Sequence, residues 1–173
     1  MNKNFKGVIC LNFFIILFNI SWGQTINESI YNEIRLNSYS SDEDFSIYVD
    51  KFYRDLAFYG IYTVKPKNII IKFSNLNSLK ITTHMHGVSF GQNDESKIEI
   101  YINPSSWNKF NKPKRYYLMY HELAHDILDL EDLEAIPQNK GKLMYPELWE
   151  FEQMSMDDFI EISKAFFEEL SNS

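Results

Sequence analysis

The chain has 173 residues, the length of one ordinary domain, and it carries 17 Lys and Arg against 24 Asp and Glu, for a net charge of −7. This acidic balance, without a basic patch, argues against a nucleic-acid binder that works by neutralising phosphates. Hydrophobic residues make up 45% of the chain and aromatic residues 16%, which is enough to build a core and excludes a disordered or collagen-like protein.

Residues 1–23 have the pattern of a secretory signal peptide. A lysine-containing start precedes an apolar run over 8–20, and Ser21 and Gly23 are the small residues expected before a cleavage site at Gln24. The run of about 13 residues is shorter than the roughly 20 that a membrane-spanning helix needs, although an uncleaved anchor is the alternative. We therefore expect export to the periplasm or the extracellular space.

The mature chain would then be residues 24–173, one domain without a stable membrane span. The signal peptide holds two of the 17 basic residues, Lys3 and Lys6. The mature chain therefore has 15 basic and 24 acidic residues and a net charge of −9. The signal peptide also holds Cys10, the only cysteine, so the mature protein would have neither a disulfide nor a cysteine metal ligand. Its stability must come from its core.

The first half of the mature chain predicts one helix and several short strands. Residues 24–40 are polar and indicate a loose leader or a short first element. Helical spacing of apolar residues over 41–59 predicts a helix with Ser41 as its N-cap and Gly60 as its stop.

Three later segments have the composition of strands, namely residues 68–73, 79–84 and 97–103. The last of them alternates apolar and polar residues, which predicts a strand with one buried face. Gly87 and Gly91 mark the turn region before it.

The second half of the chain is mainly helical. After a predicted loop over 104–112, residues 114–128 form a helix with a wide apolar stripe, as expected of a central, largely buried helix. Residues 129–142 are acidic and turn-like. Ser155 is the predicted N-cap of a last helix, whose inward residues would be Phe159, Ile162, Phe166 and Leu170. The pattern predicts a single α+β domain, with a small mixed sheet packed on an N-terminal and a central helix, and a C-terminal helix.

Residues 121–125 have the sequence HELAH, an H-E-x-x-H motif on the predicted central helix. Because His121 and His125 are four residues apart, both imidazoles lie on one helical face and can reach one cation. Two neutral imidazoles suit zinc, and a catalytic zinc site takes three protein ligands and keeps a fourth position open. Glu122, about 100° around the helix, can approach a water there as general base and then general acid.

The alternative for His121 and His125 is that both are ordinary helix histidines. A shuffled chain of this composition would contain about 0.007 matches to the motif, which favours the metal site. His84 and His86 stand two apart on a predicted strand and would point the same way, which is compatible with metal binding or with exposed or core histidines.

The motif and its surroundings resemble zinc metallopeptidases of the zincin type, and especially a metzincin-like group of small exported bacterial proteins regarded as zinc metallopeptidases. The similarity extends through residues 100–104 (IYINP), Trp107, residues 120–128 (YHELAHDIL) and residues 143–146 (LMYP). With the helix at 41–59 it covers most of the mature chain. It implies a minimal zincin-like domain with an active-site helix at 120–128.

In such proteins the strand before the active-site helix pairs with extended substrate, and a turn containing methionine lies beneath the metal. By resemblance, residues 98–102 would be the substrate-binding edge and Met144 the turn methionine, with an inner strand and a core methionine as the alternatives. Tyr145 is a candidate hydrogen-bond donor to the oxyanion of the tetrahedral intermediate, or else a packing residue.

The third metal ligand departs from the family pattern. Similar proteins have a histidine ten or eleven positions beyond the first one, where this chain has Glu131 and Asp132, and no histidine follows His125. Either carboxylate can bind zinc through oxygen. We prefer Asp132, on the eleven-residue spacing, with Glu131 as the alternative. A solvated acidic loop without a ligand role is the other reading.

The sequence therefore predicts an exported zinc-dependent metallopeptidase that hydrolyses peptide bonds in a peptide or protein substrate. His121, His125 and Asp132 would hold Zn²⁺, and Glu122 would be the general base. One alternative is a catalytically inactive zincin-like domain with a weakened metal site, which binds a partner without turnover. Another is an exported binding module in which the motif is accidental.

Overall fold

The computed structural model describes residues 28–79, 85–148 and 153–172. Its helices and strands are α1 (Glu28–Leu36), α2 (Ser46–Phe58), β1 (Asn68–Phe73), β2 (Gly87–Ser89), β3 (Lys97–Ile102), α3 (Pro104–Lys109), α4 (Lys112–Leu128) and α5 (Met156–Ser171), with short 3₁₀ turns at Leu76–Ser78 and Pro137–Asn139. The predicted α+β class, with a small mixed sheet in one domain, is confirmed. Of the described helices, none has the length and apolarity needed to cross a bilayer. The predicted signal peptide lies outside the described residues.

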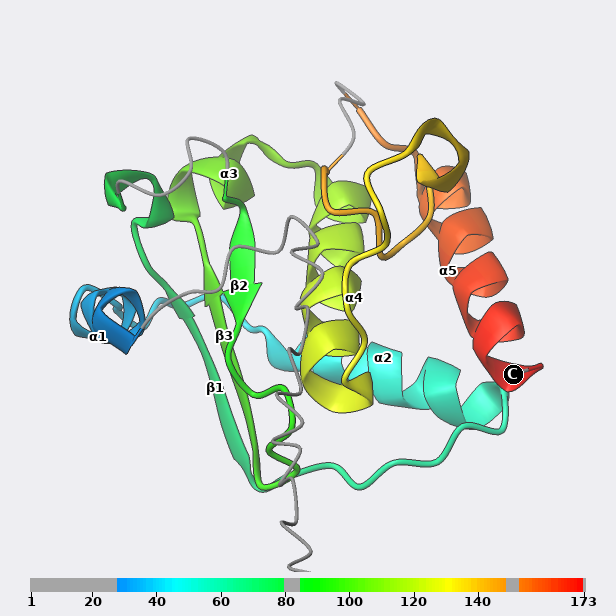
Figure 1. The fold of residues 1–173 in the computed structure, drawn as a ribbon, viewed down its shortest axis with the longest axis horizontal. Helices are drawn as coiled ribbons and strands as arrows, with labels where there is room; N and C mark the ends of the chain where they lie inside the picture. Colours follow the sequence, from blue (N-terminus) through cyan, green and yellow to red (C-terminus); the bar gives the residue numbers. More distant parts are fainter. Residues whose placement is uncertain (1–27, 80–84, 149–152, 173) are drawn as a thin grey trace, which may run out of the picture.

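The sheet has the strand order β1-β3-β2. β1 runs parallel to β3, with Asn68 opposite Lys97, and β2 runs antiparallel to β3, with Gly87 opposite Ile102. Within the described part of the chain, β3 is therefore the central strand and β2 an edge strand. Figure 1 shows α1 on one side of this sheet and α4 on the other, with α5 beyond α4.

β3 is buried on both faces, which corrects the prediction of one buried face. Ile98, Ile100 and Ile102 are fully buried in the core that includes α2 and α4. Glu99 and Tyr101 point to the opposite face and are only 1% and 3% exposed, because α1 covers that face. Of the two expectations for residues 24–40, the short first element is therefore correct, and this element, α1, covers the second face of the sheet.

α4 is the centre of the main core, and α2 and α5 pack against it. Phe52 of α2 meets Tyr120 of α4 edge-on, with ring centroids 5.0 Å apart, and Phe159 of α5 meets the same tyrosine at 4.9 Å. Phe167 rather than Phe166 is the fully buried aromatic residue near the end of α5. Each such side chain stabilises the fold by roughly 1.5–3 kcal/mol through burial.

Two helix starts follow from identifiable caps. Asn111 caps α4 by accepting a hydrogen bond from the Lys114 N–H. Ser155 caps α5 as predicted, in a reciprocal capping box with Asp158. The start of α2 differs from the prediction: Ser41 accepts from the Glu43 N–H in a turn, and the helix begins only at Ser46.

Two predicted irregular segments contain regular structure. Residues 104–112, expected to be a loop, begin with α3, because Asn103 caps the Ser105 N–H and proline occupies the first helical position. The glycine-rich turn region contains β2. Of the strand predicted at 79–84, Leu79 directly follows the 3₁₀ turn at Leu76–Ser78, and residues 80–84 lie outside the described part of the chain.

Candidate metal centre

His121 and His125 lie one turn apart on one face of α4. Their Nε2 atoms are 3.1 Å apart, and the two ring planes are nearly perpendicular. Both side chains are mostly buried, 11% and 17% exposed. The helical spacing alone brings the two nitrogens to one point, as predicted.

The second nitrogen of each ring is held by a backbone carbonyl. His121 Nδ1 lies 2.8 Å from the Leu143 carbonyl oxygen, and His125 Nδ1 lies 2.5 Å from that of Leu130. A carbonyl can only accept, so each Nδ1 carries the proton, and in the neutral ring each Nε2 presents its lone pair inward. This is the arrangement by which backbone carbonyls orient metal-binding histidines.

Asp132 reaches the two rings because the chain turns back after α4. Asp129 ends the helix in the left-handed conformation, with φ of 52°. The Leu133 N–H then bonds to the Met144 carbonyl at 2.8 Å, which anchors the next residue of the returning chain. As a result, Asp132 Oδ1 lies 3.3 Å from the Nε2 atom of each histidine. This oxygen is buried and accepts no hydrogen bond of good geometry from the described residues.

The three atoms fit a metal ion. His121, His125 and Asp132 are the only group of three such residues within the described part of the chain whose ligand atoms lie within 4.8 Å of one another. Ligands at the usual zinc distances and tetrahedral angles are about 3.3 Å apart, which agrees with separations of 3.1, 3.3 and 3.3 Å. The set also suits other divalent ions that accept nitrogen and oxygen ligands.

The cluster needs a positive charge. Burial lowers the pKa of His125, but Asp132 and the charge of Glu122 outweigh that effect and raise it to about 9. Burial raises the pKa of Asp132, whereas the two adjoining imidazoles outweigh it and hold that pKa below its usual range. Without a metal, a proton fills this need, so metal and proton compete for the same lone pairs.

Glu122 lies beside the cluster, against the edge strand. Its side chain is buried, and a methyl group added at Gly87 of β2 would come within 2.6 Å of its Oε1 atom. Burial raises the pKa of this carboxyl, and the charges of His121 and His125 oppose that rise. Among the described residues no donor bonds to this carboxylate, which leaves it available to a water or a substrate.

The other predicted site residues have distinct surroundings. Glu131 is exposed and accepts a hydrogen bond from Gln92 at 3.0 Å, so the fold brings Asp132, and not Glu131, to the histidines. Met144 is buried in the core and holds the returning chain through its carbonyl. Tyr145 is also buried, and its N–H bonds to the Lys142 carbonyl at 3.2 Å.

The prediction that residues 98–102 form the substrate-binding edge is wrong. β3 has a partner on each side, and the edge strand next to α4 is β2. Of the other two histidines, His86 Nδ1 lies 2.8 Å from Ser106 Oγ, and His84 lies outside the described residues.

Asp126 was missed by the sequence reasoning, although it is the most heavily bonded carboxylate of α4. It stands one turn after Glu122 and accepts three hydrogen bonds, two from the sheet and one from Gly91 just beyond β2. A signal was present: two carboxylates stand four apart on the predicted helix, and the small residues Gly87, Ser89 and Gly91 occupy every second position before the last predicted strand.

No protein-family model, no curated protein sequence and no solved structure matches this chain significantly.

Proposed function

We propose that this protein is an exported, zinc-dependent peptidase that hydrolyses peptide bonds. The observation that carries the proposal is the convergence of three atoms able to bind a metal, from His121, His125 and Asp132, with the Glu122 carboxylate within electrostatic range of all three. An exported protein also suits the signal-peptide pattern of residues 1–23.

His121, His125 and Asp132 would hold the ion. When bound, Zn²⁺ polarises a carbonyl and makes a water more acidic, which are the two needs of peptide hydrolysis. One carboxylate among the ligands gives the site a net charge of +1, whereas three histidines would give +2. We therefore expect a less acidic water and a higher pH optimum than at a three-histidine site.

Glu122 would move the protons. It takes a proton from the attacking water as the oxygen bonds to the carbonyl carbon, and it later delivers that proton to the leaving amine as the C–N bond breaks. Burial supports this role, because a raised pKa brings a carboxyl nearer to the pH at which it works as both base and acid. Tyr145 remains a candidate donor to the oxyanion, and its burial is also consistent with the alternative of a packing role.

The edge strand β2 is where we expect extended substrate to bind. The Phe90 N–H bonds to the Glu99 carbonyl and the Asn103 N–H to the His86 carbonyl, so the even-numbered residues of this strand pair with β3. In an antiparallel ladder the backbone groups of Gly87 and Ser89 then point to the side away from β3. A peptide added along that side would pass over Glu122.

Metal analysis tests the first half of the proposal. Protein purified without a histidine tag should contain or bind one equivalent of zinc. Asp132→Ala should weaken the affinity at least about 100-fold, since even indirect partners of a metal ligand are worth 10–100-fold. Glu131→Ala is the matched control and should bind as wild type. Absence of zinc binding by wild-type protein would refute the metal site.

Cleavage of a peptide library tests the second half. Glu122→Gln should retain zinc and lose roughly 10²–10⁴-fold in rate, the usual worth of a positioned acid–base group. If zinc-loaded wild type cleaves no member of the library, the peptidase proposal fails, and a metal-binding domain without turnover replaces it. N-terminal sequencing of the exported protein should begin at Gln24.

A further inference from the structure

Asp126 connects the candidate active-site helix to two strands of the sheet. Its Oδ2 atom accepts hydrogen bonds from the Ser89 hydroxyl at 2.8 Å, the Gly91 N–H at 2.9 Å and the Glu99 N–H at 3.0 Å. The side chain is buried, and none of the three donors belongs to α4. One atom of the helix therefore fixes both the end of β2 and the start of β3.

The face of β2 that meets α4 is built to admit carboxylates. Gly87 and Ser89 of β2, and Gly91 just beyond it, alternate along one face. A methyl group at Gly91 would overlap the Asp126 carboxylate, and one at Gly87 would press on Glu122. Larger side chains on this face would push the strand away from the helix.

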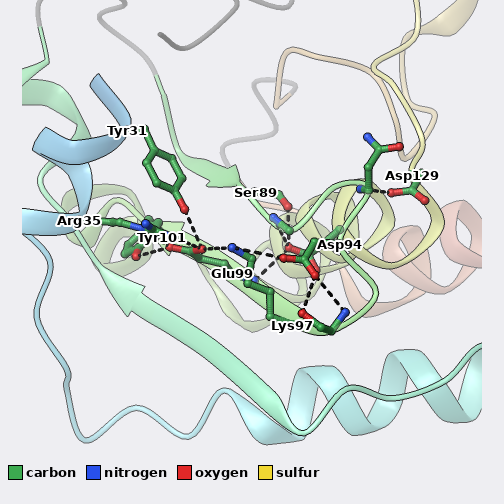
Figure 2. A network of polar contacts seen from close by, with 12 residues as sticks. Tyr31, Arg35, Ser89, Asp94, Lys97, Glu99, Tyr101 and Asp129 are labelled. Atoms are coloured by element: carbon green, nitrogen blue, oxygen red, sulfur yellow. Dashed lines mark hydrogen bonds and ion pairs between the residues drawn. The ribbon is translucent and has the colours of Figure 1, made fainter. Parts of the chain in front are cut away.

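The Asp126 carboxylate also stands where the ladder between the two strands ends. The Phe90 N–H bonds to the Glu99 carbonyl at 2.7 Å, but the Glu99 N–H goes to Asp126 rather than to β2. Ser89 and Glu99 are seen near one another in Figure 2. The carboxylate thus takes the place of a strand partner at the point where β2 leaves the sheet.

We propose that Asp126 is a positioning residue, which holds the edge strand β2 at a fixed height over Glu122 and so aligns a bound peptide with the metal cluster. β2 has only three residues, so its ladder with β3 alone leaves it poorly fixed. The inference rests on the proposed function, because it assigns β2 as the strand that pairs with substrate.

Substrate length provides the first test. We expect Asp126→Ala to reduce kcat/KM roughly 10- to 100-fold for an octapeptide, the scale of effect of a misplaced substrate, mainly through KM. A blocked dipeptide that does not reach along β2 should be cleaved as by wild type, and zinc affinity should not change. Asp126→Asn should restore part of the loss, because the amide oxygen keeps an acceptor with two lone pairs where the three donors converge.

Milder variants keep the test valid if Asp126→Ala does not fold. Ser89→Ala removes one of the three donors and should raise KM for the octapeptide less than the alanine variant does. Ser96→Ala is the matched control, since the Ser96 hydroxyl bonds only to the exposed Asp94. An equal loss on octapeptide and dipeptide, or a loss of zinc affinity, would overturn the positioning role.

Amide hydrogen exchange of the metal-free protein separates this inference from the proposed function. In Asp126→Ala, or in Ser89→Ala, residues 87–91 should exchange faster while β1 exchanges as in wild type. Unchanged exchange at 87–91 overturns the inference even if the wild type is an active peptidase. Conversely, an inactive wild-type protein refutes the peptidase proposal whatever the exchange of this strand.

Discussion

Glu99 and Asp132 are carboxylates on opposite sides of the sheet, and their surroundings differ. Glu99 points to the face covered by α1, and its side chain is 1% exposed. It accepts hydrogen bonds of 2.6–2.9 Å from Tyr31, Arg35, Lys97 and Tyr101. Figure 2 shows these residues around Glu99. Asp132 instead faces two imidazole lone pairs, and its buried Oδ1 accepts no well-formed hydrogen bond.

The difference separates a structural cluster from a binding site. Both oxygens of the Glu99 carboxylate accept hydrogen bonds from protein donors, so this cluster is stable without a bound ligand. In the cluster of His121, His125 and Asp132, acceptors face acceptors, which costs stability unless a cation or a proton lies between them. Proteins keep such costs mainly at functional sites. The same contrast predicts opposite responses to mutation, metal and pH.

The largest expected effect is on stability, from Glu99→Gln. Arg35 would lose its counter-charge and Lys97 would keep only Asp94, at 3.6 Å, whereas breaking a buried ion pair costs about 3–5 kcal/mol. Because the Arg35 side chain is 41% exposed and that of Lys97 20%, we expect roughly 2–4 kcal/mol from urea unfolding. Asp50→Ala, which breaks the exposed pair with Lys65, is the control and should leave the midpoint unchanged. Equal midpoints for both variants would contradict the structural role of Glu99.

Zinc should act on the other cluster only. At a free concentration 100 times the Kd, binding stabilises the folded state by about 2.7 kcal/mol, which corresponds to a rise in Tm of about 5–10 °C for a protein of this size. His121→Ala and Asp132→Ala should lose this rise, whereas Glu99→Gln should keep it from a lower starting Tm. A rise that survives in Asp132→Ala would show that the ion binds elsewhere.

Two buried glutamates should respond to pH with opposite sign. Burial raises the pKa of Glu99, but Lys97 and Arg35 outweigh it and hold that pKa below its usual value of 4.5, so its stabilisation is present above pH 4.5 and is lost as the pH falls further. The pKa of Glu122 is raised by burial, so ionisation destabilises the metal-free fold at higher pH and the penalty disappears below pH 4.5.

Unfolding curves of two variants between pH 3 and pH 8, in the presence of a chelator, check these signs. Glu99→Gln should be less stable than wild type at pH 7, and the deficit should shrink towards pH 3. Glu122→Gln should be more stable than wild type at pH 8, and that gain should shrink in the same direction. If the stability differences of the two variants from wild type changed with pH in the same direction and sign, the opposite roles of Glu99 and Glu122 would be contradicted.

The parts of the fold that the sequence predicted are those that local spacing determines. His121 and His125 meet because a helix brings residues four apart onto one face, and Asp132 follows soon after the end of that helix. The alternating residues of β3 and the N-cap at Ser155 are equally local signals. Local pattern also predicted α4, the helix that carries this site, from its wide apolar stripe.

What the sequence did not predict depends on contacts between distant segments. The three residues of β2 are a strand only because β3 lies beside them, and the edge could not be assigned before the strand order was known. The alternating pattern predicts that Glu99 faces solvent. In the structure it is covered by α1, which lies more than sixty positions earlier in the chain. α3 is different, because its cap at Asn103 followed by proline was a readable signal.

The smallest expected effect tests single donors on the two sides of the sheet. Tyr31→Phe removes one of the hydrogen bonds to Glu99 and should cost about 0.5–1.5 kcal/mol, without any change in zinc affinity. Tyr117→Phe removes the hydrogen bond from Tyr117 to the Lys142 carbonyl, beside the carbonyl of Leu143 that orients His121, so it should cost a similar amount and also weaken zinc binding. Urea unfolding and zinc titration of the two variants together make the comparison. If the two variants change zinc affinity equally, the clusters are coupled through the sheet, and the separation between structural cluster and binding site does not hold.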